Sequence, residues 1–340
     1  MGLAVSLTGP LAPMGTDACR GLELWAEEAR PGGRPVVLLV RDDGSERARV
    51  RREVETLLDE EHVELLAGPY SSGLTRAVAP LAEARNVVLW NHGGAADDIH
   101  CCGHRYVIGI LTPASRYLVP ALRRVRTGEV LAVHRPASGF SAAVARGAVE
   151  EAVRQRRVVR LEPYPETPED MDTLAARLAV APAGLVVGAG RFSDDVELAR
   201  ALRRQGLDVP AALVAAGIGA FREALGEAAD GFLGPSQWEP RAPIDPDVGP
   251  TPQDFAHRFR ARFGVGPDYP AAQAYAAGLV MGRCVDMAGG TEQQALRAAA
   301  AALDVTTLLG RFRIDPATGT QIGHDVRLVR WEGGERRVIA

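Results

Sequence analysis

The motif with the clearest chemical meaning is the loop Gly68-Pro69-Tyr70-Ser71-Ser72-Gly73, which separates an apolar run from a helical pattern. In a parallel sheet, such a loop lies at the carboxyl end of a strand, where ligands bind. The helix N-terminus that follows presents free N–H groups and a partial positive charge. Ser71 and Ser72 can therefore cap the helix, donate hydrogen bonds to a carboxylate, or do both.

A second motif, Gly188-Ala189-Gly190, closes an apolar run and precedes a helical pattern, as in a dinucleotide-binding fingerprint. Two features count against that function. The third glycine position is Ser193, and Asp208 precedes the following strand, whereas the ribose-binding acid belongs at that strand's end. We therefore expect no cofactor.

Possible metal ligands are concentrated in one segment, which contains His92, His100, Cys101, Cys102 and His104. Their spacing matches no standard zinc module. We interpret the segment as a polar loop and expect no metal, an interpretation that a metal assay would test.

No other segment indicates catalysis. The sequence has no Gly-x-Ser-x-Gly motif, and its 39 cationic residues are all arginine, which removes Schiff-base chemistry and a P-loop lysine. Adjacent carboxylates such as Asp42-Asp43 are typical of solvated turns or helix starts. We assign no catalytic residue.

The amino-acid composition excludes further classes of protein. The chain has 340 residues, a net charge of −4 and 46% hydrophobic residues, which suits a globular protein of two lobes. There is no basic excess to attract nucleic acid, and no apolar run approaches the roughly 20 residues of a membrane-spanning helix. Four cysteines are too few for a disulfide scaffold.

The first residues, Met1-Gly-Leu-Ala-Val-Ser-Leu-Thr, alternate and stop at Gly9-Pro10 like a first strand. A secretory signal would instead show a basic segment, an apolar segment and a small-residue cleavage site. Two alternatives stay open: a leader has been removed, or the chain is a cytoplasmic protein or a piece of a larger one.

Apolar periodicity predicts two series of alternating strands and helices. The first has strands at 3–7, 36–41, 63–67 and 87–90 and helices at 16–29, at 46–61 and over residues 74–81. The second has strands at 130–134, 158–162, 184–187, 212–215 and 231–234 and helices at 116–126, 141–154, 171–180 and 194–205. Helices at 252–263, 269–288 and around 298–302 complete the chain. This order predicts an α/β fold with two doubly wound parallel-sheet lobes.

Five segments, in this order, resemble the type I periplasmic solute-binding proteins, which are the branched-chain amino acid and amide receptors of ABC importers. They are Val5-Ser6-Leu7-Thr8-Gly9-Pro10-Leu11-Ala12, Val40-Arg41-Asp42-Asp43, Gly68-Pro69-Tyr70-Ser71-Ser72, residues 200–209 ending in Gln-Gly-Leu-Asp-Val, and Phe312-Arg313-Ile314-Asp315. The match is collinear over essentially the whole chain.

The resemblance implies two lobes joined by a three-stranded hinge, which close on a small molecule in the cleft between them without chemistry. Lobe one would comprise residues 1–112 and 240–324, and lobe two would comprise 113–239 and 325–340. The hinges would lie at 111–114, 236–239 and 323–326. An ABC permease is the expected partner.

The resemblance also implies a set of ligand contacts. Ser71 and Ser72 occupy the loop that holds the ligand carboxylate, and Gly93 falls where the family offers a carbonyl to the ligand amine. Asn91, two residues before Gly93, is a further candidate contact. Ala95 replaces a hydroxyl residue, and Ala216 replaces an acidic residue that faces the ammonium. Arg191 replaces an aromatic residue. The remaining candidates are Met14, Trp90, Phe140, Trp238 and Tyr275.

These departures disfavour an ordinary α-amino acid, because a buried ammonium without a hydroxyl or carboxylate partner costs several kcal/mol. Arg191 could instead form a bidentate pair with a carboxylate. With Trp90, Phe140, Trp238 and Tyr275 as walls, we predict an aromatic or branched organic acid. In the alternative, both tryptophans are buried core residues and Arg191 pairs with Asp194 or Asp195.

Our prediction is thus a solute receptor of an ABC importer, located outside the cytoplasm if a leader was removed. Two other functions stay open. One is a nicotinamide-dependent oxidoreductase, which NAD alone would stabilise. The other is a ligand-sensing or regulatory domain of the same fold, which could have lost its pocket.

Overall fold

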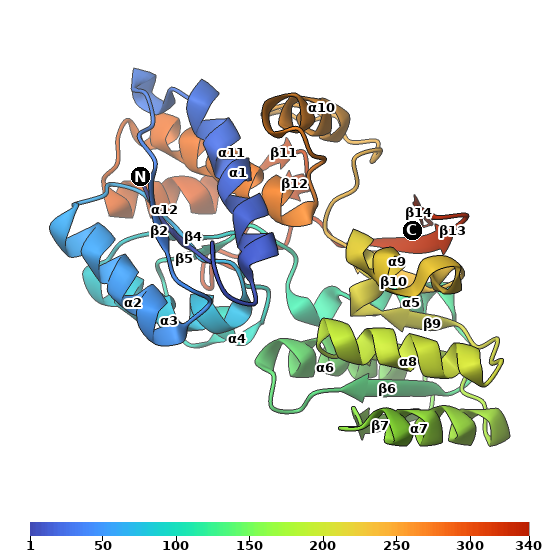
Figure 1. The fold of residues 1–340 in the computed structure, drawn as a ribbon. Helices are drawn as coiled ribbons and strands as arrows, with labels where there is room; N and C mark the ends of the chain where they lie inside the picture. Colours follow the sequence, from blue (N-terminus) through green and yellow to red (C-terminus); the bar gives the residue numbers. More distant parts are fainter. Residues whose placement is uncertain (340) are drawn as a thin grey trace. The chain divides into compact units, whose positions relative to one another are not determined.

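The computed structural model describes residues 1–339, which form two compact units (Figure 1). Unit 1 contains Met1–Pro113 and Gln237–His324. Unit 2 contains Ala114–Ser236 and the described residues from Asp325 onward. The chain therefore passes from one unit to the other three times.

Unit 1 is built on a five-stranded sheet of order β2-β1-β3-β4-β5, in which every neighbouring pair is parallel. Its strands are β1 (Gly2–Val5), β2 (Leu39–Asp42), β3 (Leu66–Ala67), β4 (Leu89–Asn91) and β5 (Val107–Gly109). Its helices are α1 (Ala12–Glu28), α2 (Arg47–Glu55), α3 (Ser72–Arg85), α4 (Asp98–Cys101), α10 (Pro252–Phe263), α11 (Tyr269–Ala288) and α12 (Gln293–Ala302). A small hairpin, β11 (Val305–Thr307) and β12 (Gly310–Phe312), follows α12.

The core of unit 1 forms on one face of this sheet. Because side chains alternate between the faces of a strand, Leu3, Val5, Trp90 and Ile108 all point the same way. They pack in one buried cluster with α1, α10, α11 and α12. Helices α2 and α3 pack against each other and contact the sheet at β1 and β4.

Unit 2 is built on a seven-stranded sheet of order β14-β13-β10-β9-β8-β6-β7. Its strands are β6 (Val130–His134), β7 (Val159–Pro163), β8 (Leu185–Ala189), β9 (Ala211–Leu213), β10 (Leu233–Ser236), β13 (Arg327–Glu332) and β14 (Glu335–Val338). Its helices are α5 (Val119–Arg124), α6 (Gly139–Arg154), α7 (Pro168–Val180), α8 (Phe192–Arg204) and α9 (Gly219–Leu225). Strands β6 to β10 are parallel, and β13 and β14 are antiparallel.

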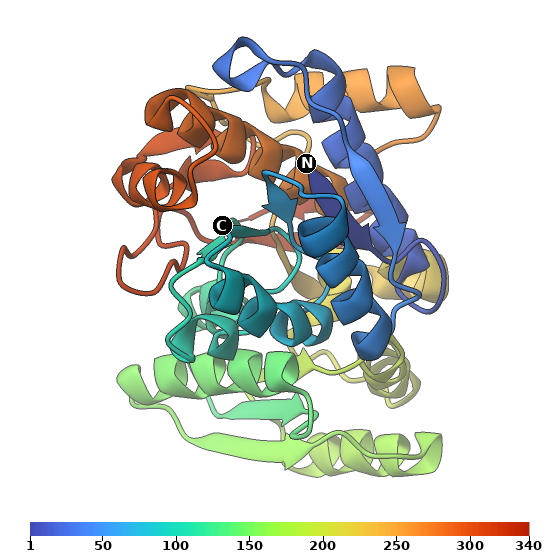
Figure 2. The same cartoon turned by 90° about the vertical axis from the view of Figure 1, so that its left-hand side faces the viewer.

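The helices of unit 2 cover both faces of its sheet. Side chains of α7 and α8 form a buried cluster with Leu131, Val186 and Leu213 of the strands. Helix α6 contacts β6 and β8, and Figures 1 and 2 both show it beside β6. The predicted α/β fold with parallel sheets is confirmed. None of the described helices is long and apolar enough to span a membrane.

Helices α10 and α11 have the predicted bounds, because strong local signals fix both ends. Thr251 caps α10 by accepting from the N–H of Asp254 at 3.1 Å, and Asp268 caps α11. Gly264 and Gly289 end the two helices in the left-handed conformation, which glycine adopts at little cost.

Several predicted elements differ in the structure. The strand expected at 212–215 ends at Leu213, because Val214–Gly217 form a tight turn whose Ala215 N–H donates to Asp195. The helix expected at 46–61 is α-helical only over Arg47–Glu55 and ends in a wider turn. Strands β5, β11, β12, β13 and β14 were not predicted.

Candidate ligand-binding site

Ser71 lies at the turn from β3 into α3 and has a φ of 95°, a backbone strain of about 1–3 kcal/mol for a residue other than glycine. Its N–H donates to the Gly93 carbonyl at 3.1 Å, and its Oγ accepts from the Leu74 N–H at 3.3 Å. Thr75 Oγ1 donates to its carbonyl at 2.9 Å. Ser71 therefore caps α3, while its hydroxyl hydrogen has no acceptor among residues 1–339 and can donate to a ligand.

Ser72 connects the loops that follow β3 and β4. Its Oγ accepts from the N–H of Ala96 at 3.0 Å, and the residue is only 9% exposed. Ala95 is 7% exposed and adds no polar group beyond its backbone. Ser72 thus has a structural role that the sequence did not indicate.

The loop after β4 is closed by Asn91. Its Oδ1 accepts from the Gly94 N–H and its Nδ2 donates to the Gly94 carbonyl, both at 2.8 Å. Gly93 packs against the β3 loop so closely that a Cβ atom there would lie 2.5 Å from Tyr70 Cα and 2.6 Å from the Pro69 carbonyl oxygen. The two candidate loops therefore form one connected surface, with Gly93 at their contact.

A tyrosine pair beside this surface was missed by the sequence analysis. The hydroxyls of Tyr70 and Tyr269 are hydrogen-bonded, and their ring centroids lie 6.4 Å apart. Burial raises the pKa of Tyr70 to about 12, so its hydroxyl stays protonated. Tyr70 belongs to the Gly68–Gly73 loop, but its partner is 199 residues away in the chain. Met14 is half-buried near the start of α1.

The carboxylates Asp42 and Asp43 are not both solvated, contrary to expectation. Asp43 is fully buried, and Ser6 Oγ donates to it at 2.6 Å. Burial alone would raise the pKa of Asp42, but hydrogen bonds from Thr8, Gly44 and Leu7 lower it to about 2. Both side chains thus tie the loop after β1 to the loop after β2.

Three of the expected aromatic walls lie in the core of unit 1. Trp90, Trp238 and Tyr275 are 0%, 1% and 3% exposed and belong to its buried cluster. Trp238 and Tyr275 both pack against the ring of Phe255, at 5.6 and 4.9 Å between centroids. For Trp90 and Trp238, the structure favours the alternative that they are core residues.

In unit 2, Phe140 lies in the first turn of α6, after the carboxyl end of β6. It is half-buried and stacks edge-to-face on Tyr117, with centroids 5.4 Å apart and planes at 80°. Of the aromatic residues expected to contact a ligand, Phe140 therefore keeps a ring that is partly exposed.

Arg191 follows the carboxyl end of β8, and its side chain is exposed. It does not pair with Asp194 as the alternative required: only its backbone N–H donates to that carboxylate, at 2.8 Å. The carboxylate instead receives two bonds at 2.8 Å from Arg135, which also pairs with Glu166. Within residues 1–339, the guanidinium of Arg191 makes no hydrogen bond or ion pair.

Asp195 joins the carboxyl ends of three strands. It accepts from Tyr164 Oη at 2.6 Å after β7, from the Gly190 N–H at 3.1 Å after β8, and from the Ala215 N–H at 2.8 Å after β9. Burial raises its pKa to about 6, against the opposing effect of these three hydrogen bonds. Asp195 therefore holds the carboxyl ends of β7, β8 and β9 together, and Arg191 forms no hydrogen-bonded side-chain pair with either aspartate.

Ala216 is fully buried, and its carbonyl accepts from Trp331 Nε1 at 2.8 Å.

The two glycines of the Gly188-Ala189-Gly190 motif are explained by packing. A Cβ on Gly188 would lie 2.4 Å from Tyr164 Oη, and a Cβ on Gly190 would lie 2.6 Å from Asp194 Cβ. The motif thus makes room for the hydrogen-bonded side chains around Asp195.

The segment with possible metal ligands forms no common site. His92 is fully buried, which lowers its pKa to about 4. The ring of His100 lies 3.1 Å from the Thr318 carbonyl, and Cys101 and Cys102 are exposed. Residues 1–339 contain no group of three or more His, Cys, Asp or Glu side chains placed to hold a metal ion.

Parallel α/β units with strand-end loops of this kind have the architecture of type I periplasmic binding proteins. The chain belongs to the periplasmic binding protein family, whose sequence profile matches residues 1–335.

Known proteins similar to this chain agree with that assignment. Leu/Ile/Val-binding protein homolog 7 of Brucella abortus is 24% identical in an alignment 327 residues long that covers 90% of this chain and 81% of that protein. A leucine-binding protein of Thermotoga maritima superposes with a TM-score of 0.87 at 17% identity, covering 100% of this chain and 97% of its own. A Rhodopseudomonas palustris ABC-transporter solute-binding protein, solved with 3,4-dihydroxybenzoic acid, has a TM-score of 0.81 at 18% identity over 99% and 94% of the two chains.

Proposed function

We propose that this chain is the solute-binding component of an ABC importer and that it binds a small carboxylate without chemical change. The observation that supports this ligand class is the exposed guanidinium of Arg191 at the carboxyl end of β8, which makes no hydrogen bond or ion pair with the described residues and interacts only electrostatically with Asp194. Such a group forms strong, bidentate hydrogen bonds with a carboxylate.

Both units supply ligand contacts in this proposal. Ser71 and the Gly93 loop would contribute from unit 1, and Phe140 and Arg191 from unit 2. Units 1 and 2 would be the two lobes, moving about the three chain crossings. The predicted lobes, 1–112 with 240–324 and 113–239 with 325–340, differ from the units by at most three residues at each crossing. The importer's permease is the expected partner, and the site of action is outside the cytoplasm.

The charges of the site favour an organic acid over an α-amino acid. An ammonium needs an anionic or hydroxyl partner, but Asp194 is already paired with Arg135 and Asp195 is buried with three donors. Ala95 and Ala216 supply neither group. A desolvated ammonium would therefore lack compensation that a neutral organic body does not need.

The half-buried aromatic rings support a planar or branched ligand body. Tyr70 and Tyr269 in unit 1 and Phe140 in unit 2 are partly exposed, whereas the tryptophans are in the core. Aromatic rings of this kind contribute large apolar contact areas at binding sites. The 3,4-dihydroxybenzoic acid bound by the Rhodopseudomonas protein has this chemistry, and we propose the same class here.

A thermal-shift and calorimetry panel tests the proposal. It contains benzoate, 3,4-dihydroxybenzoate, leucine, isoleucine, NAD and the neutral analogue benzamide. Stabilisation by an aromatic acid and not by benzamide is expected, since only a ligand that binds the folded state raises Tm. Stabilisation by leucine alone would contradict the ligand class, and stabilisation by NAD alone would contradict the receptor function.

Replacement of Arg191 by alanine is expected to weaken carboxylate binding by about 10- to 150-fold, the equivalent of one charge-assisted hydrogen-bonded pair. Tm should change little, because the side chain makes no hydrogen bond or ion pair within residues 1–339 and interacts only electrostatically with Asp194. The control is Arg200→Ala, which removes an exposed arginine of α8, the helix that begins directly after Arg191; Arg200 pairs with Glu197 at 2.6 Å and donates to the Ala224 carbonyl at 3.0 Å. Equal affinity in both variants, measured calorimetrically with the acid that binds, would remove Arg191 from the site.

Replacement of Ser71 by alanine is expected to have two separable effects. Loss of the α3 cap costs about 1 kcal/mol of stability, and loss of a hydroxyl that contacts a carboxylate costs about 1–3 kcal/mol of binding. Thr251→Ala removes a comparable cap from α10 in the same unit and should lower only stability. If calorimetry gives the same Kd for both variants, Ser71 has only the capping role.

A further inference from the structure

Arg135 directly follows β6 and binds two carboxylates and a carbonyl of unit 2. Its guanidinium donates to both oxygens of Asp194, each at 2.8 Å, and to the Pro165 carbonyl at 3.1 Å. It also pairs with Glu166. The Arg135 side chain is only 13% exposed, so water and salt screen its bonds with Asp194 less than they screen a surface pair.

The backbone of Arg135 is fixed as well. Its N–H donates to Ser141 Oγ at 2.7 Å, and that hydroxyl donates to the Ala189 carbonyl at the end of β8. The guanidinium carbon lies 5.9 Å from the ring centroid of Tyr164, which follows β7. Backbone and side chain are therefore both held at the carboxyl ends of these strands, which favours the planar, bidentate pair with Asp194.

The carboxylate that Arg135 binds also lies within electrostatic reach of Arg191. Asp194 is in the first turn of α8 and accepts from the backbone N–H of Arg191 at 2.8 Å. Burial alone would raise the pKa of Asp194, but hydrogen bonds from Arg135 and the Arg191 N–H, together with the charges of both arginines, lower it. Asp194 could therefore take Arg191 as its partner if Arg135 did not occupy both of its oxygens.

We propose that Arg135 is a positioning residue that keeps the Arg191 guanidinium free and so gives the solute site its preference for an anion. It neutralises Asp194, which would otherwise pair with Arg191 or attract a cationic ligand. The selectivity rests on the proposed function, because it requires Arg191 to contact the ligand. The choice of partner by Asp194 requires no ligand and is testable by itself.

Removal of the Arg135 charge should make Asp194 exchange partners. The Asp194 side chain is 9% exposed, and a carboxylate so shielded from water is unfavourable without a counter-ion. The guanidinium of Arg191 is available, since it makes no hydrogen bond or ion pair within residues 1–339. In Arg135→Gln we therefore expect Arg191 to be paired with Asp194.

Modification by phenylglyoxal reports the state of Arg191 without any ligand. The reagent attacks accessible guanidinium groups, and mass spectrometry of peptides from the full chain gives the rate at Arg191. Arg135→Gln should slow this rate at least about fivefold, and the double variant Arg135→Gln with Asp194→Asn should restore it. Arg135→Lys should give an intermediate rate, because an ammonium lacks the planar fork that binds both oxygens, and it keeps the test decisive if the glutamine variant does not fold.

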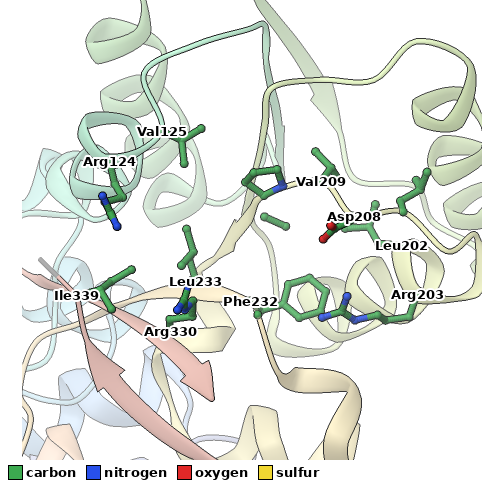
Figure 3. Close-up of a pocket in the computed structure, with 14 residues that line it drawn as sticks. Arg124, Val125, Leu202, Arg203, Asp208, Val209, Phe232, Leu233, Arg330 and Ile339 are labelled. Atoms are coloured by element: carbon green, nitrogen blue, oxygen red, sulfur yellow. The ribbon is translucent and has the colours of Figure 1, made fainter. Parts of the chain in front are cut away.

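Arg203→Gln is the matched control, because it removes another arginine with several hydrogen bonds, at the far end of α8 (Figure 3). Arg203 donates to the carbonyls of Ala228 and Asp230 and lies 4.6 Å from the Phe232 ring centroid. Its loss frees no carboxylate beside Arg191, so the rate there should equal that of the wild type.

Two results of the modification experiment would overturn the proposal. One is a wild-type rate at Arg191 in Arg135→Gln or Arg135→Lys, once circular dichroism shows that the variant is folded. The other is an equally slow rate in Arg135→Gln and in the double variant, because the effect would then not pass through the charge of Asp194.

Calorimetry with benzoate and benzylamine, which share a ring and differ in charge, tests the selectivity. Arg135→Gln should bind benzoate at least about tenfold more weakly than the wild type and benzylamine more tightly, and the double variant should regain the affinity for benzoate. An unchanged preference between the two probes would overturn the selectivity. If the proposed function were wrong, the wild type would bind no carboxylate probe, whereas Arg191 would still lose its reactivity in Arg135→Gln, which would support the positioning role alone.

Discussion

Replacement of Gly93 by alanine is expected to abolish ligand binding and to lower the stability of unit 1 by about 3 kcal/mol. The new Cβ would lie 2.5 Å from Tyr70 Cα and 2.6 Å from the Pro69 carbonyl oxygen. Both atoms are backbone, so no side-chain rotation relieves the overlap. The loops after β3 and β4 must separate, which also breaks the bond from Ser71 N–H to the Gly93 carbonyl.

Gly290→Ala is the matched control for this prediction. Gly290 is also in unit 1, and an added Cβ would meet nothing within 4 Å. Urea unfolding should distinguish the two variants, and calorimetry with the acid that binds should show at least about a hundredfold loss only for Gly93→Ala. Full affinity in Gly93→Ala would show that these two loops do not form the binding surface.

Replacement of Asp195 by alanine is expected to destabilise unit 2 by about 4 kcal/mol, because it leaves the Tyr164 hydroxyl and the N–H groups of Gly190 and Ala215 buried without an acceptor. The effect should concentrate at the carboxyl ends of β7, β8 and β9. Hydrogen exchange of peptides that cover these strand ends, measured across a urea series, is the appropriate readout. Asp172→Ala, which removes an exposed partner of Arg204, should change stability by less than about 1 kcal/mol.

The same substitution should change how stability depends on pH. The pKa of Asp195 is raised from 3.8 to about 6 by burial, so the folded chain binds this proton more tightly than the unfolded chain. The stabilisation that protonated Asp195 adds to the free energy of unfolding is fully present below pH 3.8 and is lost as the pH rises through 6. Subtracting the Asp195→Ala stability curve from the wild-type curve should therefore give a difference that declines between pH 4 and 6 and is flat above pH 7. A flat difference throughout would mean that burial does not raise this pKa.

Local signals in the sequence were sufficient for much of the fold. Helices α10 and α11 were predicted with the bounds that the structure shows, because capping residues and terminal glycines act within one turn. The parallel order of the sheets followed from strands that alternate with helices. Strand β5 was missed, and so was the β13–β14 hairpin despite its Gly333-Gly334 turn.

The candidate site was predicted only in part, for a physical reason that Trp90 and Arg191 illustrate. Periodicity shows that Trp90 is in a strand. Whether its side chain is buried depends on which face of the sheet is covered by helices α10, α11 and α12, which lie far away in the sequence. Asp194 was a plausible partner for Arg191 because it is close in sequence. The structure pairs it with Arg135 instead, 59 residues away, because β6 and β8 are neighbours in the sheet.

The sequence by itself determined the family, the order of elements and the loops at the carboxyl ends of the strands, since these depend on short-range periodicity, capping and turn residues. Only the tertiary structure decided which polar groups are free to bind. Hydrogen-bond partners such as Ser71 with Gly93, Tyr70 with Tyr269 and Asp195 with Ala215 come from segments that only the packed sheets bring together. A side chain's availability is a property of those neighbours, and that is why only the folded chain shows that the Arg135 side chain is engaged by Asp194 whereas the Arg191 side chain makes no hydrogen bond.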